Sequence, residues 1–191
     1  MNLTDPQQLS SALQALQSGN NTIIKNSEKA LKAFGKNPEC INALLVQIQS
    51  NSDEHCRLQA ALLLKKNIGK HYKKYSPENR VFLKNGLLGI LTNDPVNSVR
   101  TAIAGTVSTL AKTVYETEAE GWPDLFTLLA QLSLDPDERK RSMSYNLAGQ
   151  LSEYIHKYLL PFSGQMAQLY ARGLSDSSQE VIKEAMRAVA G

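Results

Sequence analysis

The sequence contains two cysteines and three histidines, the side chains that most often act as nucleophiles, bases or zinc ligands. Cys56 and His71 would lie about four turns apart on one helix, too far for a thiol–imidazole pair. His55 adjoins Cys56 and therefore points to a different helix face. The spacing of these residues matches no zinc motif, and there is no glycine-rich phosphate loop or G-x-S-x-G turn. We therefore predict a protein that is not an enzyme and that uses no metal and no cofactor.

Binding chemistry is better represented, because basic side chains cluster in one short segment. After Arg57 and up to residue 83, the only acid is Glu78, and the bases are Lys65, Lys66, Lys70, Lys73, Lys74 and Arg80. Four of these lysines fall away from an apolar stripe that runs from Leu58 to Tyr72 on a helical wheel. Such a face can attract an acidic partner, although a solvated helix surface would have the same composition. An acid-rich stretch, residues 116–138, has no lysine or arginine and suits loops and helix starts or a basic partner.

The elements that position these residues repeat along the chain. Asp53, Asp94, Asp135 and Asp176 are each 41 residues apart, and each follows a short polar or helix-breaking stretch. Proline follows two of them, which suits the first turn of a helix. We therefore predict that each aspartate is the N-cap of a helix, and that the chain arose by duplication.

Apolar residues recur at three- and four-residue steps on both sides of each aspartate, and no alternating pattern indicates a strand. The sequence therefore predicts an all-α superhelix, a HEAT-repeat solenoid of about five helical pairs that share a core. We expect a capping pair at residues 1–37 and further repeats at 38–76, 77–117, 118–158 and 159–191. The pattern continues to the last residues, so we expect the N-terminal fragment of a longer solenoid.

Composition excludes several other classes. The chain has 42% hydrophobic and 20% charged residues and a formal net charge of +3, as is ordinary for a soluble protein. No stretch reaches the roughly 18 apolar residues of a membrane helix, and the N-terminus lacks the features of a signal peptide. The basic residues are mostly confined to one helical pair, whereas a nucleic-acid binder would need a basic stripe across several. We therefore expect no membrane partner and no direct nucleic-acid partner.

Three segments together resemble the N-terminal end of the importin β (karyopherin β) family of nuclear transport receptors. They are the helix from Arg57 to Ile68 with Lys70-His71-Tyr72, the sequence Val99-Arg100 with Ala102 and Ala104, and Gly121-Trp122-Pro123-Asp124-Leu125. The likeness covers essentially the whole chain and is best to importin-four-type receptors, which carry ribosomal proteins and histones. This chain departs from the pattern at Tyr72, where many relatives have tryptophan, and in its slightly basic charge.

The resemblance implies specific partners and residues. The second helices of the first repeats would bind the small GTPase Ran in its GTP form, with Lys66, Asn67, Lys70 and Arg100 as candidate contacts. Arg100 could instead brace the next repeat through a carboxylate. Trp122 would be a structural anchor for the fourth repeat. Grooves between first helices would take phenylalanine-glycine repeats of nucleoporins, with Phe82, Leu83 or Leu87 as candidates.

The full-length receptor would carry basic protein cargo and shuttle between cytoplasm and nucleus through nuclear pores. An alternative is a HEAT-repeat scaffold or adaptor for a multiprotein complex unrelated to nuclear transport. Scaffolds of that kind are stacked more regularly and lack the Trp-Pro opening and the Leu-Lys-Lys-Asn turn found here.

Overall fold

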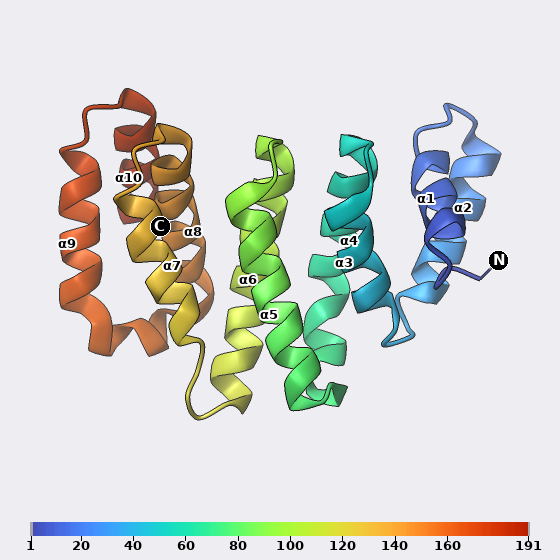
Figure 1. Ribbon diagram of the computed structural model, residues 1–191, viewed down its shortest axis with the longest axis horizontal. Coiled ribbons are helices and arrows are strands. Elements are labelled where there is room, and N and C mark those ends of the chain that lie inside the picture. Colours follow the sequence, from blue (N-terminus) through green and yellow to red (C-terminus); the bar gives the residue numbers. More distant parts are fainter. Residues whose placement is uncertain (1, 191) are drawn as a thin grey trace. The chain divides into compact units, whose positions relative to one another are not determined.

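The computed structural model describes residues 2–190, and within them it contains helices and no strand. Figure 1 shows the helices in order along the chain, with α3 beside α4 and α7 beside α8. The first are α1 (Pro6–Ala15), α2 (Asn21–Phe34), α3 (Cys40–Ser50), α4 (Glu54–His71), the short 3-10 helix η1 (Tyr72–Lys74) and α5 (Pro77–Asn93). The others are α6 (Asn97–Thr117), α7 (Pro123–Ser133), α8 (Glu138–Leu159), the 3-10 helix η2 (Leu160–Phe162), α9 (Ser163–Leu174) and α10 (Gln179–Ala190). The predicted all-α fold class is confirmed, whereas the individual repeat boundaries stay predictions.

The chain forms two compact units, Met1–Thr106 and Val107–Gly191, and the division falls within α6. In the first unit, α4 presents its small and apolar face to the core, where Cys56, Ala60, Leu64 and Ile68 are fully buried. Asp53 caps α4 by accepting from the backbone N–H of His55 at 2.9 Å. An apolar face, a capped start and lysines of good helix propensity explain why this segment is helical.

The second unit is built around α8, which packs on both α7 and α10. Trp122 precedes α7 and is 1% exposed, and Tyr145 of α8 is fully buried. Gly173 of α9 lets the chain approach the Tyr145 ring, because a Cβ there would lie 2.5 Å from two ring carbons. Gly121 has a φ of +63°, and this left-handed conformation turns the chain into α7. Gly173 therefore makes room for the Tyr145 ring, and Gly121 provides the turn that leads into α7.

The predicted N-cap role holds for Asp53 and is wrong for the other three aspartates. Asp94 ends α5, and α6 begins three residues later, at Asn97. Asp135 and Asp176 likewise precede α8 and α10 by three residues. Each of these three carboxylates accepts the backbone N–H two residues further on, at 2.8–2.9 Å. The aspartates therefore fold the turn that enters each helix, as Asx turns do, and do not cap the helix.

The true register of the turns differs from the predicted one at its first position. Asn51 accepts the backbone N–H of Asp53 at 2.9 Å, so Asn51 is the counterpart of Asp94 and Asp135. Asp53 corresponds instead to Asp137, which caps α8 by accepting from Arg139 at 3.0 Å. Asp53 and Asp94 therefore have different roles, and their spacing of 41 residues does not reflect equivalent positions in two repeats. Asparagine and aspartate both fold an Asx turn, so the spacing of the aspartates alone does not identify Asn51.

A buried arginine links two successive turns in the first unit. Arg57 donates from Nη1 to the carbonyl oxygens of Asn51 at 3.1 Å and Ser52 at 3.4 Å. Its Nε and Nη2 donate to the two carboxylate oxygens of Asp94 at 3.0 and 3.4 Å. Both side chains are at most 10% exposed. This arrangement, which we call the arginine fork, joins the α3–α4 turn to the α5–α6 turn.

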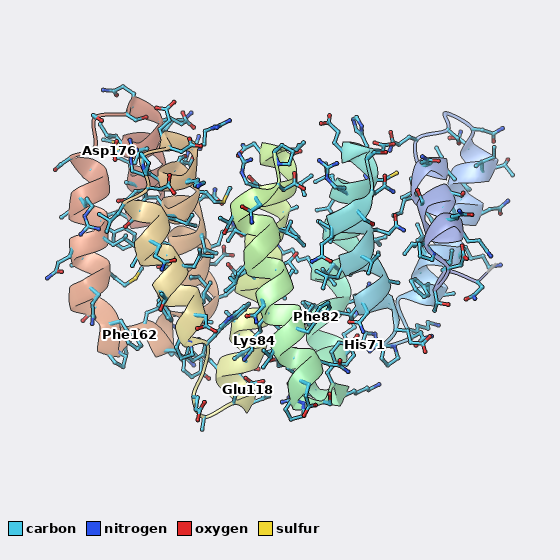
Figure 2. The ribbon with its side chains drawn as sticks, viewed as in Figure 1. His71, Phe82, Lys84, Glu118, Phe162 and Asp176 are labelled. Atoms are coloured by element: carbon cyan, nitrogen blue, oxygen red, sulfur yellow. The ribbon has the colours of Figure 1, made fainter. Side chains whose placement is uncertain are left out.

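The second unit contains the same arginine fork. Arg141 donates from Nη1 to the carbonyl oxygens of Asp135 at 2.9 Å and Pro136 at 3.0 Å. Its Nε and Nη2 donate to Asp176 at 2.8 and 3.0 Å, and Figure 2 labels Asp176 near one end of α10. Arg57 and Arg141 both stand six residues after the acceptor that folds their turn. The fork is therefore a repeated feature of this solenoid.

This fork gives stability that depends on acidity. Hydrogen bonds from Arg141 hold the pKa of Asp176 below its usual value. An unfolded aspartate has a pKa of about 3.9, so the folded protein binds this proton less readily. The stabilisation is therefore complete above the unfolded pKa and is lost as pH falls through the folded pKa. We expect the urea midpoint, followed by circular dichroism, to fall between pH 5 and pH 3 less steeply for Asp176→Asn than for the unmodified protein. Equal slopes would contradict this account.

Candidate functional site

The predicted residues Lys66, Asn67 and Lys70 come together on one side of α4, in a groove of about 500 Å³ that α2 and α4 form. We call it the α2–α4 groove. Lys66 and Lys70 are exposed, whereas Asn67 is 6% exposed. Asn67 donates from Nδ2 to the carbonyl oxygen of Leu63 at 2.8 Å, and Lys70 Nζ is 3.5 Å from its Oδ1. Asn67 is thus fixed in place while the two lysines reach toward solvent.

The end of α2 fits tightly against α4 at this groove. Gly35 follows α2, and a Cβ there would lie 3.0 Å from both amide atoms of Asn67. His71 Nε2 lies 2.9 Å from the Gly35 carbonyl oxygen, and Figure 2 labels His71 at the lower end of α4. Since the carbonyl can only accept, His71 carries its proton on Nε2. Gly35, Asn67 and His71 therefore set the spacing of the two helices.

Two lysines that sequence reasoning missed complete the groove. Lys32 and Lys36, near the end of α2, are exposed and line it opposite α4. Its apolar lining comes from Leu16, Leu31 and Leu63, and its acids are limited to Glu28. Lys25, Lys29, Lys32 and Lys36 recur at helical spacing along α2, a signal present in the sequence. The groove thus combines four ammonium groups with a partly apolar surface, an arrangement that suits an acidic protein surface.

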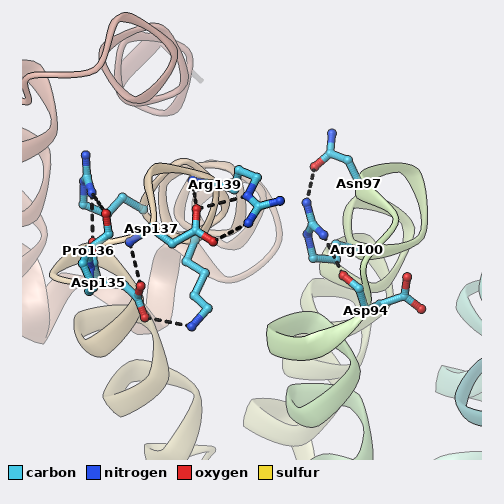
Figure 3. A network of polar contacts seen from close by, with 9 residues as sticks. Asp94, Asn97, Arg100, Asp135, Pro136, Asp137 and Arg139 are labelled. Atoms are coloured by element: carbon cyan, nitrogen blue, oxygen red, sulfur yellow. Dashed lines mark hydrogen bonds and ion pairs between the residues drawn. The ribbon is translucent and has the colours of Figure 1, made fainter.

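Arg100 does not line this groove. It donates from Nη1 to the Asp94 carbonyl oxygen at 2.6 Å and from Nη2 to Asn97 Oδ1 at 3.2 Å (Figure 3). It stands six residues after Asp94, as Arg57 and Arg141 do after their own turn residues. Its observed contacts therefore stabilise the α5–α6 turn, and its place in a Ran contact stays a prediction.

The acid-rich stretch contains local ion pairs. Lys140 Nζ lies 3.0 Å from Asp135, and Arg139 Nη2 lies 2.9 Å from Asp137 (Figure 3). Hydrogen bonds from the Arg139 side chain and backbone lower the pKa of Asp137 to about 2. These two acids thus have partners within their own turn, which favours the prediction of loops and helix starts over a basic partner for this end of the stretch.

The cysteines are placed for packing. Cys40 and Cys56 are both fully buried, and burial raises the pKa of each thiol to about 11. Both therefore remain protonated and weakly nucleophilic at neutral pH. Within residues 2–190, no group of three or more His, Cys, Asp or Glu residues is arranged to hold a metal ion. The same residues include no helix that is both long and apolar enough to cross a membrane.

Helix pairs joined by Asx turns and linked by buried arginine forks define an α-helical repeat protein of the HEAT type. A family model described as the importin-β N-terminal domain matches residues 27–93, and one described as IPO5-like, TPR repeats matches residues 95–191. The chain therefore belongs to the importin β (karyopherin β) family.

Two relatives show which members of the family the chain resembles. It is 30% identical over 193 residues to a probable importin-5 homolog of Dictyostelium discoideum, covering 96% of this chain and 18% of that protein. It is 27% identical over 107 residues to importin-4 of Mus musculus, covering 56% of this chain and 10% of that protein. The predicted likeness to importin-four-type receptors is supported in part, since an importin-5 homologue also matches. The chain spans less than a fifth of either relative.

Solved structures confirm the fold. Yeast importin-β (Kap95p) matches with a TM-score of 0.82 at 19% identity, over 97% of this chain and 24% of that one. Kap121p bound to RanGTP matches with a TM-score of 0.76 at 20% identity, over 96% of this chain and 17% of that one. At these identities the likeness establishes the HEAT-type solenoid fold.

Proposed function

We propose that this chain is a segment of a nuclear import receptor and that its α2–α4 groove binds Ran in its GTP form. The observation that carries the proposal is the convergence of Lys32, Lys36, Lys66 and Lys70 around a groove with Leu31 and Leu63 in its lining. Family membership supports it, and a structural neighbour of the same fold is described as bound to RanGTP. The alternative of an unrelated scaffold lacks such support.

The proposed groove suits a regulated partner. Ammonium groups around an apolar surface steer an acidic protein and orient it, while the leucines gain from losing water. Asn67 packs against Gly35, and His71 forms a hydrogen bond with its carbonyl oxygen. These contacts hold the end of α2 against α4, so the groove is formed before any partner arrives. In the full-length receptor, Ran-GTP binding would lower the affinity for basic cargo such as ribosomal proteins or histones. That coupling would follow if the two ligands favour different curvatures or overlapping surfaces of the solenoid.

The decisive test is a titration with Ran loaded with a non-hydrolysable GTP analogue, beside Ran-GDP. We expect selective binding of the GTP form by isothermal titration calorimetry. Lys66→Glu with Lys70→Glu should weaken it roughly a hundredfold, about tenfold for each reversed charge in a desolvated contact. Lys32→Glu with Lys36→Glu should weaken it similarly.

A matched control is available on the adjoining 3-10 helix. Lys73 and Lys74 are exposed and lie outside the groove lining. Lys73→Glu with Lys74→Glu makes the same change in net charge and should weaken binding by only about threefold, through long-range steering. Equal loss in the control and groove variants would refute the placement of the site. Absence of GTP-selective binding to the unmodified protein would refute the proposed function of this segment.

Nucleoporin phenylalanine-glycine repeats are proposed as further partners. Of the three candidates, Leu83 and Leu87 are fully buried core residues, so a groove role for their side chains is wrong. Phe82 of α5, which Figure 2 labels, is 59% exposed, and the preceding residue, Val81, is 52% exposed. Structural neighbours include a Kap95:Nup1 complex and Kap121p bound to Nup53p. We propose that Phe82 is the contact of the three, and that the receptor shuttles between cytoplasm and nucleus.

A further inference from the structure

The linker between η1 and α5 in the first unit carries an exposed serine followed by proline. Ser76 precedes Pro77, and none of the other prolines of the chain follows a serine or a threonine. Both residues are exposed, and the Ser76 backbone is extended, with φ −63° and ψ 156°. Proline-directed protein kinases bind their acceptor serine in an extended chain, with proline as the next residue. Ser76 therefore has the local sequence and conformation of a substrate of these kinases.

The hydroxyl group of Ser76 has few and exposed contacts. Its Oγ accepts from the backbone N–H of Asn79 at 3.4 Å, which is long for a hydrogen bond. The Glu78 carboxylate accepts from its own backbone N–H and from the Ser76 hydroxyl, and these bonds lower the pKa of Glu78. Asn79 and Glu78 are themselves exposed. The oxygen that a kinase would modify is therefore accessible from solvent.

The segment around Ser76 can open with little loss of buried surface. A kinase binds several residues on each side of the acceptor, so the first turn of α5 must unwind for the reaction. Residues 77–79 are exposed, and the first buried residue of α5 is Leu83. Lys73 and Lys74, on the other side of the linker, are exposed as well. Exposed helix ends open at a much smaller free-energy cost than the whole fold, so this turn becomes transiently available.

A phosphate on Ser76 would lie among cations. Arg80 donates from Nε to the Tyr75 carbonyl oxygen at 3.1 Å and from Nη2 to the Lys73 carbonyl oxygen at 3.0 Å, so its guanidinium lies against the linker. Lys73 and Lys74 precede Ser76 by three and two residues. Phosphoserine carries a charge of about −1.5 to −2 at neutral pH and has three strong acceptor oxygens. Nearby cations and the start of a helix both stabilise such a group.

We propose that Ser76 is the acceptor of a proline-directed protein kinase and that its phosphate fixes the linker between η1 and α5. ATP supplies the phosphoryl group. A bond forms between Ser76 Oγ and the γ-phosphorus, the bond from that phosphorus to the bridging oxygen breaks, ADP leaves, and the hydroxyl proton passes to the base of the kinase. The phosphate then accepts from the Arg80 guanidinium and from backbone N–H groups at the start of α5. Ser76 lies outside the lining of the α2–α4 groove, so this modification does not rest on the proposed Ran contact.

The site is tested by incubating the full chain with a purified proline-directed kinase, magnesium and ATP, and by locating the phosphate with peptide mass spectrometry. We expect phosphate on Ser76. Pro77→Ala keeps the serine and should slow its modification about tenfold, because the kinase loses one contact with its specificity pocket. Ser52→Ala changes an exposed serine that Asp53 follows, and it should leave the rate unchanged. Phosphate on other residues with Ser76 unmodified, or an equal rate in the Pro77→Ala variant, would overturn the site.

The effect of the phosphate on the linker is tested by thermal unfolding, followed by circular dichroism. Phosphorylation should raise the Tm by about 2–4 °C. Arg80→Gln removes a partner of the phosphate, so it should reduce this rise to about half. Lys25→Gln makes the same charge change at an exposed position of α2 and should leave the rise intact. A Tm that does not rise, or a rise that both variants reduce equally, would contradict the proposed role of the phosphate.

Discussion

Replacing Arg57 by alanine is expected to lower the free energy of unfolding by about 3–5 kcal/mol, the cost of leaving a buried charge without its partner. Asp94 is 6% exposed at its side chain, and Arg57 is its cation. Without the guanidinium, the buried carboxylate loses two charged hydrogen-bond donors, and the link between the two turns is broken. Urea denaturation followed by circular dichroism at pH 7 measures the effect.

Two comparison variants separate the contribution of the fork to stability from the contribution of side-chain packing. Arg57→Met with Asp94→Asn removes both charges and keeps an acceptor for the turn, so it should recover a large part of the loss. Arg100→Ala removes an arginine at the equivalent position whose observed acceptors are a backbone carbonyl and an amide. It should cost only about 1 kcal/mol. If Arg57→Ala costs no more than Arg100→Ala, the buried fork is not a major source of stability.

The second large effect is expected at the single tryptophan of the chain. Trp122→Ala should destabilise the protein by about 3–5 kcal/mol, because a side chain that is 1% exposed is replaced by a cavity. Trp122→Phe should cost less, about 1–2 kcal/mol, since the indole Nε1 is buried without a hydrogen-bond partner. Removing this unpaired N–H offsets part of the destabilisation that the smaller side-chain volume causes.

Circular dichroism in urea is the suitable measurement here, because both variants remove the only tryptophan fluorescence. Leu134→Ala provides the control, since Leu134 is 65% exposed and should change stability by less than about 0.5 kcal/mol. A phenylalanine variant as unstable as the alanine variant would show that the indole shape, and not its apolar volume, is what this core requires.

Sequence reasoning predicted the helices because their apolar stripes repeat at helical spacing. It predicted the turns less well. Asn51 and Asp94 each fold an Asx turn with a different side chain, whereas Asp53 is the N-cap of a helix. Periodicity in α4 predicted that Lys66 and Lys70 face away from the core. It did not reveal that Lys32 of α2 lies across the groove, because that pairing depends on how two separate helices pack. Likewise, only burial distinguishes Phe82 from its neighbour Leu83.

The arginine forks have a consequence for how the protein melts. In a linear array of repeats, stability divides into the folding energy of each repeat and the coupling energy between neighbours. Each fork spans two successive turns, so its energy belongs to the coupling and not to either repeat. Strong coupling with weak individual repeats favours cooperative melting of neighbours over fraying one at a time. A variant without its fork should therefore show a broader transition as well as a lower midpoint.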